Sequence, residues 1–176
     1  ARDGENANSA ILVGIEPAYF SSDHPLAGMY DQRKIEQAAF RLGGGDYTAP
    51  AQLVGDFLAD RPSHELGAVR PTCPTGVLLG DIAQVLPARV IEVMRVALVQ
   101  MDQKLKGFAL PDAVITAPET RSSSPVRILR DEFLQSNLRG LYPCGEGGGW
   151  AGGILSAAAD GMRCAEQICN ALNQEA

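Results

Sequence analysis

Residues 141–161 read LYPCGEGGGWAGGILSAAADG, and the character of the chain changes twice within them. The short apolar segment over 138–144 predicts a strand. Residues 145–153 then hold six glycines in nine positions, which leaves the main chain bare of side chains and permits positive φ at sharp turns. Residues 154–172 predict a helix, whose apolar face is formed by Ile154, Ala158, Met162, Ala165, Ile168 and Leu172. We therefore expect a strand, a glycine-rich loop and a helix in direct succession.

The glycine-rich loop has two interpretations. The helix after it begins with unpaired N–H groups and the positive end of its dipole, which suits an anion or an electron-rich carbonyl group. No Gly-Lys-Ser/Thr follows, so the loop is not a Walker loop, and the dinucleotide fingerprint G-x-G-x-x-G is absent from an opening βαβ unit. The loop either binds another ligand or is a tight turn that packs a helix closely on a strand.

The rest of the chain mixes helical and extended patterns. Apolar spacing and end signals predict three further helices, over 29–42, 48–58 and 87–106. Three further strands are predicted, over 9–15, 113–116 and 126–130. Residues 61–80 are rich in Pro and Gly and predict an irregular connection. The pattern indicates an α/β protein of mixed α+β type.

The composition is that of a globular protein. The 176 residues are 45% apolar and 20% charged, and the net charge is −6. An acidic balance without a Lys/Arg block argues against nucleic acid and against an anionic membrane as partners. The longest stretch without charged residues, 147–159, has 13 residues, fewer than the roughly 18 that a membrane-spanning helix needs.

Four cysteines, Cys73, Cys144, Cys164 and Cys169, form no C-x-x-C pair and lie near no His at zinc-ligand spacing. This pattern disfavours a metal site or a secreted disulfide framework and predicts reduced thiols in a cytoplasmic protein. Cys144 directly precedes the glycine-rich loop. Without a second Cys nearby in the sequence, a small buried side chain is favoured there over a redox-active thiol. Cys164 and Cys169 are expected to pack against neighbours of the last helix.

Residues 119–127 concentrate polar groups that suit an anion. Arg121, Ser123 and Arg127 could hold a carboxylate or phosphate, because guanidinium groups and hydroxyls match such groups. The alternative is a solvated turn between strands.

The two histidines carry no recognisable catalytic motif. His24, before the helix over 29–42, is either a proton donor or a residue stacked on the helix start. His64 is expected to be solvated. Neither has a Ser or Cys partner, so a hydrolase triad has no support, and no catalytic residue is assigned.

Four segments resemble the NAD(FAD)-utilising dehydrogenases, a family of bacterial FAD-dependent oxidoreductases. They are residues 2–10, 23–28, 119–127 and 141–161, so the resemblance extends over essentially the whole chain. It implies that the chain is the C-terminal portion of a longer flavoprotein, whose N-terminal part would carry the βαβ unit that holds the ADP half of FAD. The sequence also begins Ala1-Arg2-Asp3 without an initiator Met, as expected for a portion.

The resemblance further implies that the last strand, loop and helix cover the flavin half of FAD. Glu146 would accept a hydrogen bond from a ribityl hydroxyl, and the main chain of Gly152, Gly153 and Ile154 would face the pyrimidine edge. A helix N-terminus at that edge stabilises the negative charge of a reduced flavin. The implied cofactor-binding residues are Gly145, Glu146, Gly147, Gly148, Gly149, Trp150, Ala151, Gly152, Gly153 and Ile154.

The chain departs from the family pattern at three positions. Cys144, Gly148 and Trp150 stand where the family more often has Ala, Ala and Tyr. These changes keep an aromatic ring and the other glycines, so they bear on specificity more than on cofactor binding.

We expect residues 1–110 to form a helix-rich insert or substrate domain and residues 111–176 to complete a Rossmann-like FAD-binding domain. By analogy, the intact protein would carry out FAD-mediated redox chemistry on a small-molecule substrate, with NAD(P)H as electron donor. The isolated chain would lack most contacts to FAD, so we expect it to be inactive and colourless. Two alternatives are a non-redox nucleotide- or phosphate-binding module and a structural interaction domain.

Overall fold

A three-stranded sheet is built around one central strand. The computed structural model describes residues 3–116 and 118–175. Its strands are β1 (Ala49–Leu53), β2 (Val77–Leu79) and β3 (Val114–Thr116), in the order β2-β1-β3. β2 runs parallel to β1 and β3 antiparallel to it, so Ala51 lies opposite Leu79 on one side and Thr116 on the other. The strand predicted over 113–116 is confirmed as β3.

The helix predicted over 48–58 is wrong in its first half, which forms β1 instead. Only Val54–Leu58 (α2) is helical. Pro50 favours a helix start because proline is common in the first turn of a helix, whereas it is rare in a central strand, where it cannot donate to the ladder. Ala49 donates its N–H at 3.1 Å to the residue preceding β2. The missing N–H of Pro50 therefore falls on the opposite side, where pairing with β3 begins only at Ala51.

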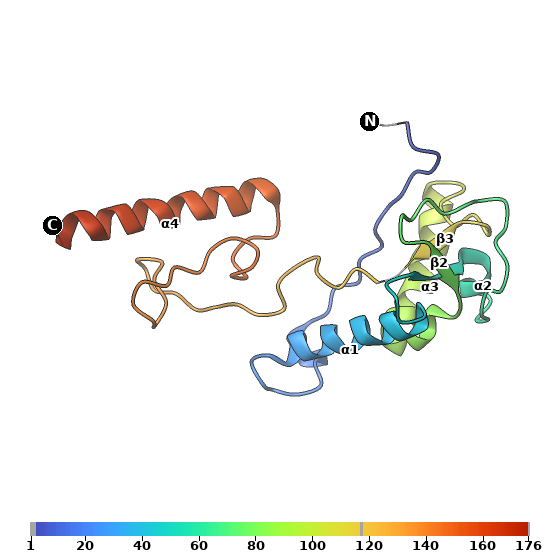
Figure 1. Cartoon of the computed structure of the whole chain (residues 1–176), viewed down its shortest axis with the longest axis horizontal. Coiled ribbons are helices and arrows are strands. Elements are labelled where there is room, and N and C mark those ends of the chain that lie inside the picture. Colours follow the sequence, from blue (N-terminus) through green and yellow to red (C-terminus); the bar gives the residue numbers. More distant parts are fainter. Residues whose placement is uncertain (1–2, 117, 176) are drawn as a thin grey trace. The chain divides into compact units, whose positions relative to one another are not determined.

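The buried core joins α2 to α3 (Ala88–Lys104), as Figure 1 lets the reader follow. It consists of Val54, Phe57, Ile91, Met94 and Leu98. The helix predicted over 87–106 is confirmed as α3. Met94 and Leu98 of its apolar stripe are buried, whereas Met101 and Leu105 farther along are exposed.

The strand predicted over 9–15 is not formed. Ile11 and Val13 pack against the core cluster, which explains the apolar character of the segment. Leu12 and Ile15 are exposed, and the segment pairs with no strand in the described part of the chain. Extended apolar chain becomes a strand only when a neighbour satisfies its main-chain groups.

The chain divides into two compact units. The first comprises Ala1–Tyr19 and Arg33–Pro118, and the second comprises Phe20–Gln32 and Glu119–Ala176. The first contains the sheet, α2, α3 and two short 3₁₀ helices, η1 (Pro17–Tyr19) and η2 (Ile82–Gln84). The division expected at residues 110 and 111 concerns the functions of the two parts and stays a prediction.

The helix α1 (Ala27–Leu42) confirms the prediction over 29–42. Its residues through Gln32 belong to the second unit, where Gly28 packs so closely that an added Cβ would lie 2.9 Å from Pro125. It ends where predicted: the Gly43 N–H donates to Ala39 at 2.8 Å.

The strands predicted over 126–130 and 138–144 are also wrong, because main-chain groups there bind turns and side chains. The Ile128 N–H donates to Gly148 at 3.1 Å, and the Leu141 N–H closes a turn with Leu138 at 3.1 Å. Neither segment pairs with a strand in the described part of the chain.

The terminal helix α4 (Ile154–Glu175) confirms the helix predicted over 154–172, but its apolar face is not the buried one. Ile154, Met162 and Leu172 are exposed. The buried positions are instead Asp160 and Cys164. In the second unit, α4 therefore packs through a face that the hydrophobic pattern did not indicate.

The observed class is mixed α/β: one three-stranded sheet and four α-helices in the described residues. The Rossmann-like character of the C-terminal part stays a prediction. Among the helices that the structure describes, none has both the length and the apolar character to cross a membrane.

Candidate functional site

The glycine-rich loop is wound by its own main-chain hydrogen bonds. The Gly149 N–H donates to the Glu146 carbonyl at 2.9 Å, and the Trp150 N–H donates to the Gly145 carbonyl at 3.0 Å. Gly145 and Gly149 have φ angles of 63° and 76°, in the region that favours glycine. The loop is therefore a pair of tight turns placed directly before α4.

The glycines of this loop fall into two groups. A Cβ on Gly149 would lie 2.4 Å from the Val126 carbonyl oxygen, and one on Gly148 would lie 2.9 Å from the Cys144 nitrogen. These glycines are required by the turn itself. By contrast, a Cβ on Gly147 would meet no atom within 4 Å, and one on Gly152 would meet only the Ser123 hydroxyl, at 4.0 Å. Nothing in the local fold requires glycine at Gly147 or Gly152.

The junction of the loop with α4 is open to solvent. Gly152 and Gly153 are exposed, and Ile154 and Leu155 retain 90% and 85% of their accessible surface. The Ser156 hydroxyl accepts from the Gly153 N–H at 3.1 Å and donates to the Gly153 carbonyl at 2.9 Å. A bare main chain, a fixed helix start and two exposed apolar side chains thus lie together.

Trp150 joins the loop to the segment before it. Its indole N–H donates to the Ile128 carbonyl at 2.9 Å. The guanidinium carbons of Arg130 and Arg127 lie 4.0 Å and 4.9 Å from the centre of its ring, within cation–π range. Arg127 also donates from Nε to the Gly149 carbonyl at 2.9 Å.

Arg130 and Asp160 form a buried ion pair beneath the loop. Arg130 donates to the two Asp160 oxygens at 2.7 Å and 3.0 Å, and about a tenth of each side chain is exposed. The Asp160 carboxylate also accepts from the Gly145 N–H at 2.9 Å. The Arg130 hydrogen bonds, followed by that of Gly145, lower the pKa of Asp160 to about 2. The carboxylate is thus a fixed charge that holds the first turn of the loop.

The sequence did not single out this ion pair. Asp160 interrupts the small apolar residues of α4, and a carboxyl group inside such a run is a signal for a buried partner. Arg130 gave a weaker signal, because its alternation with apolar residues indicated a wet strand face.

The residues predicted to bind an anion are brought to the loop in part. The Ser123 hydroxyl lies beside Gly152, and Arg127 is engaged with Gly149 and Trp150. Arg121 is exposed in the same segment, and Glu146 is exposed within the loop.

His24 lies at the start of α1 and acts as a structural group. Its Nδ1 accepts the Leu26 N–H at 3.1 Å, and its ring lies 5.7 Å from that of Tyr30. These contacts agree with the prediction of a histidine stacked on the helix start.

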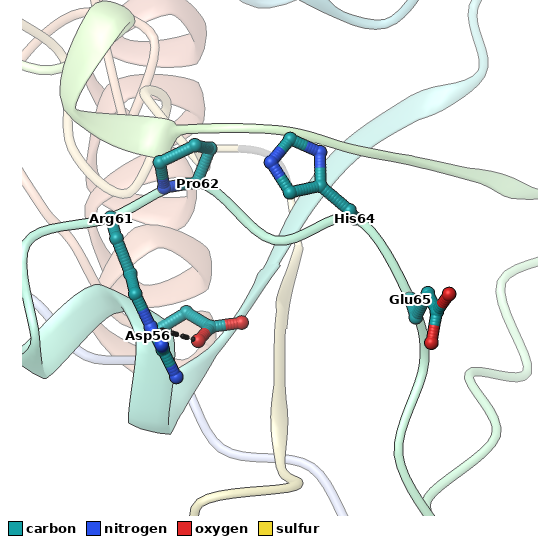
Figure 2. A pocket seen from close by; sticks show the side chains of 5 residues that line it. All are labelled: Asp56, Arg61, Pro62, His64 and Glu65. Carbon is teal, nitrogen blue, oxygen red and sulfur yellow. Dashed lines mark hydrogen bonds and ion pairs between the residues drawn. The ribbon is translucent and has the colours of Figure 1, made fainter.

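A hollow of about 390 Å³ lies in the first unit and is lined by Asp56, Arg61, Pro62, His64 and Glu65. Figure 2 shows Arg61 reaching back to Asp56, whose carboxylate accepts from Arg61 Nε at 2.7 Å. The pKa of Asp56 is lowered mainly by its hydrogen bond with the Ser63 hydroxyl, and Arg61 makes a smaller contribution. Asp56 therefore holds the segment that follows α2, through Arg61 and Ser63. His64 and Glu65 are exposed. The described residues contain no cluster of three or more His, Cys, Asp or Glu placed to hold a metal ion.

Comparison with known proteins identifies the class. A family described as FAD-dependent protein, C-terminal domain-like, has a model that matches residues 1–122. The match covers more than half of the chain, and the chain belongs to this family.

A relative from Clostridium beijerinckii (strain ATCC 51743 / NCIMB 8052), described as an uncharacterized protein, is 50% identical over 169 residues. The match covers 96% of this chain and 32% of that protein, so the chain spans about a third of the length of the curated relative. The FAD-dependent context implied by the resemblance is thus shown for the family, whereas the dehydrogenase subfamily stays a prediction.

Proposed function

We propose that this chain is the C-terminal part of an FAD-dependent oxidoreductase and that its glycine-rich loop lies against the flavin half of FAD. The observation that carries the proposal is the pair Gly147 and Gly152, where a Cβ would enter open space. Since the local fold tolerates side chains there, these two glycines leave the main chain of the junction open to a group that approaches from outside. In a family of FAD-dependent proteins, a planar flavin is the group that best fits this requirement.

The residues of the junction would each contact a different part of the cofactor. The main chain of Gly152, Gly153 and Ile154 would face the pyrimidine edge, and the exposed Glu146 carboxylate would accept from a ribityl hydroxyl. The FAD, when bound, would supply hydride acceptance. The positive end of α4 would stabilise negative charge at its start, while the bracing of Arg127 on Gly149 and Trp150 would keep the loop in place.

The rest of the protein would cover the exposed apolar face of α4. On that face Ile154, Ala158, Met162, Ala165 and Leu172 are exposed, and Ile168 is half-buried. An apolar stripe along one helix normally packs against another element. The chain corresponds to about a third of its curated relative. We therefore expect the remaining part, with the ADP-binding βαβ unit, to lie on this face.

The electron donor and the substrate follow by analogy. NAD(P)H is the expected donor, and a small anionic molecule is the expected substrate because Arg121, Ser123 and Arg127 lie in the segment that borders the loop. The structural alternative, a tight turn without a ligand, accounts for Gly145, Gly148 and Gly149 but not for Gly147 and Gly152.

The test uses the full-length protein. It should retain FAD through purification and bleach on addition of NADH or NADPH. Gly152→Ala should reduce FAD affinity by roughly tenfold, because the methyl group displaces the flavin from the main chain. Gly14→Ala in the first unit is the control, since its Cβ also meets open space, and it should leave the affinity unchanged. Full-length protein without flavin, or equal affinity for both variants, would overturn the proposal.

A further inference from the structure

We propose that Cys144 and Cys164 form an oxidisable dithiol that exchanges with low-molecular-weight disulfides. The two residues are 20 positions apart, and no local sequence pattern pairs them. The fold brings Cys164 and the residue before Cys144 to the same group, the guanidinium of Arg130. This inference concerns the second unit alone and does not depend on flavin binding.

Arg130 connects Cys164 to the residue that precedes Cys144. Its Nη1 donates to the Pro143 carbonyl at 2.8 Å and lies 3.5 Å from the Cys164 sulfur. The residue next to Cys144 and the thiol of Cys164 are therefore contacted by one nitrogen atom.

Asp160 holds Gly145, the residue that follows Cys144. Its Oδ2 accepts from the Gly145 N–H at 2.9 Å and from Arg130 at 3.0 Å. Cys164 follows Asp160 by one helical turn and so lies on the same face of α4. Both neighbours of Cys144 are thus held on the groups that flank Cys164.

The pKa of Cys164 agrees with this placement of Cys144. Burial is the main reason that the pKa of Cys164 is raised, and the proximity of Cys144 contributes to the rise. The Arg130 charge acts in the opposite direction and favours the thiolate of Cys164. A disulfide needs its two Cα atoms within about 7 Å of each other, and the hydrogen bonds that hold Pro143 on Arg130 and Gly145 on Asp160 keep Cys144 beside the face of α4 that carries Cys164.

Exposure assigns different roles to the two sulfurs. Cys144 is exposed, which contradicts the expectation of a small buried side chain, whereas Cys164 retains only 2% of its accessible surface. A reagent can therefore reach Cys144 but not Cys164. Cys169, expected to pack like Cys164, is instead exposed on α4.

The exchange proceeds in two balanced steps. The Cys144 thiolate attacks one sulfur of a disulfide RSSR, forms the mixed disulfide Cys144–SR and releases RS⁻. The Cys164 thiolate then attacks the Cys144 sulfur, forms the Cys144–Cys164 bond and releases a second RS⁻. Two protons from the cysteines pass to the released thiolates, so two protein thiols are oxidised and RSSR is reduced to two RSH. The new bond would tie the start of the glycine-rich loop to α4.

The experiment incubates the native full-length protein with oxidised glutathione, quenches with acid and maps the cysteines by peptide mass spectrometry. We expect the Cys144–Cys164 disulfide to exceed the glutathione adduct of Cys144 by roughly tenfold, because the second thiol is held nearby. Cys164→Ser should reverse this ratio and trap the adduct at Cys144. Cys169→Ser, on the same helix, should behave like the unchanged protein.

Two outcomes would overturn the inference. One is a glutathione adduct that persists at Cys144 in the unchanged protein, and the other is a Cys144 that stays unmodified. Because both are read in the unchanged protein, a folding defect of Cys164→Ser cannot hide the answer.

Discussion

Asp160 binds Arg130 through two hydrogen bonds, of 2.7 Å and 3.0 Å, at a place where both side chains are almost excluded from water. The same carboxylate holds the Gly145 N–H, and the same guanidinium holds the Pro143 carbonyl. One ion pair therefore connects the first turn of the glycine-rich loop to α4. Its removal should therefore lower the stability of the second unit.

We predict that Asp160→Asn lowers the free energy of unfolding by about 3 kcal/mol, because it leaves the Arg130 charge buried without a counter-ion. Urea titration followed by circular dichroism measures this loss. Glu166→Gln, an exposed position on the same helix, should change the free energy by less than about 0.5 kcal/mol. Equal effects of the two substitutions would show that the ion pair contributes nothing.

The low pKa of Asp160 predicts a defined acid sensitivity. The folded-state pKa of about 2 lies below the ordinary value of 3.8, so the folded state favours the ionised form. The resulting stability is present above about pH 4 and is lost as the pH falls towards about 2. Between about pH 5 and pH 2.5 the unchanged protein should therefore lose more unfolding free energy than Asp160→Asn. Parallel pH profiles of the two proteins would contradict this assignment.

Gly149 and Gly147 should respond differently to the same substitution. Gly149→Ala places a Cβ 2.4 Å from the Val126 carbonyl oxygen at a φ of 76°, and it should cost about 2 kcal/mol or more. Gly147→Ala meets no atom within 4 Å and should be tolerated within about 0.5 kcal/mol. Thermal melts of the two variants test this, and comparable losses would contradict the division of the loop into required and open glycines.

Gln52 should be essential to the first unit. This fully buried side chain donates to the Arg61 carbonyl at 2.7 Å and accepts from the Ile82 N–H at 2.9 Å. Gln52→Leu leaves both main-chain groups without their partner and should cost about 2 kcal/mol of unfolding free energy. The exposed Gln103→Leu on α3 is the control. A neutral Gln52→Leu would mean that other groups satisfy this main chain.

Helical periodicity was a reliable guide where packing and pattern agree. α1 and α3 were predicted because their apolar residues repeat on the side that meets the fold. Pro50 misled the prediction, because a proline in a central strand is tolerated only by the detailed register of its two neighbours. The strand predicted over 126–130 does not form, because its main-chain N–H and C=O groups make hydrogen bonds with a loop and with side chains and not with another strand.

The glycine-rich loop of the candidate site can be predicted from the sequence, but the ion pair that holds it in place cannot. Six glycines in nine residues are visible in any reading of the sequence. Whether a particular glycine serves the turn or leaves a surface open depends on atoms such as the Val126 carbonyl, which only the fold brings near. The pairing of Arg130 with Asp160 spans 30 residues, and no local pattern joins them.

The segment Phe20–Gln32 completes the second unit although it precedes nearly all of the first. Its packing partners there include Pro125, against Gly28, and the Thr120 carbonyl, which accepts from Gln32. During vectorial synthesis on the ribosome, this segment would emerge about a hundred residues before those partners. The second unit therefore cannot be completed before the first has been translated, and the beginning of α1 must wait until then, unpacked on one side.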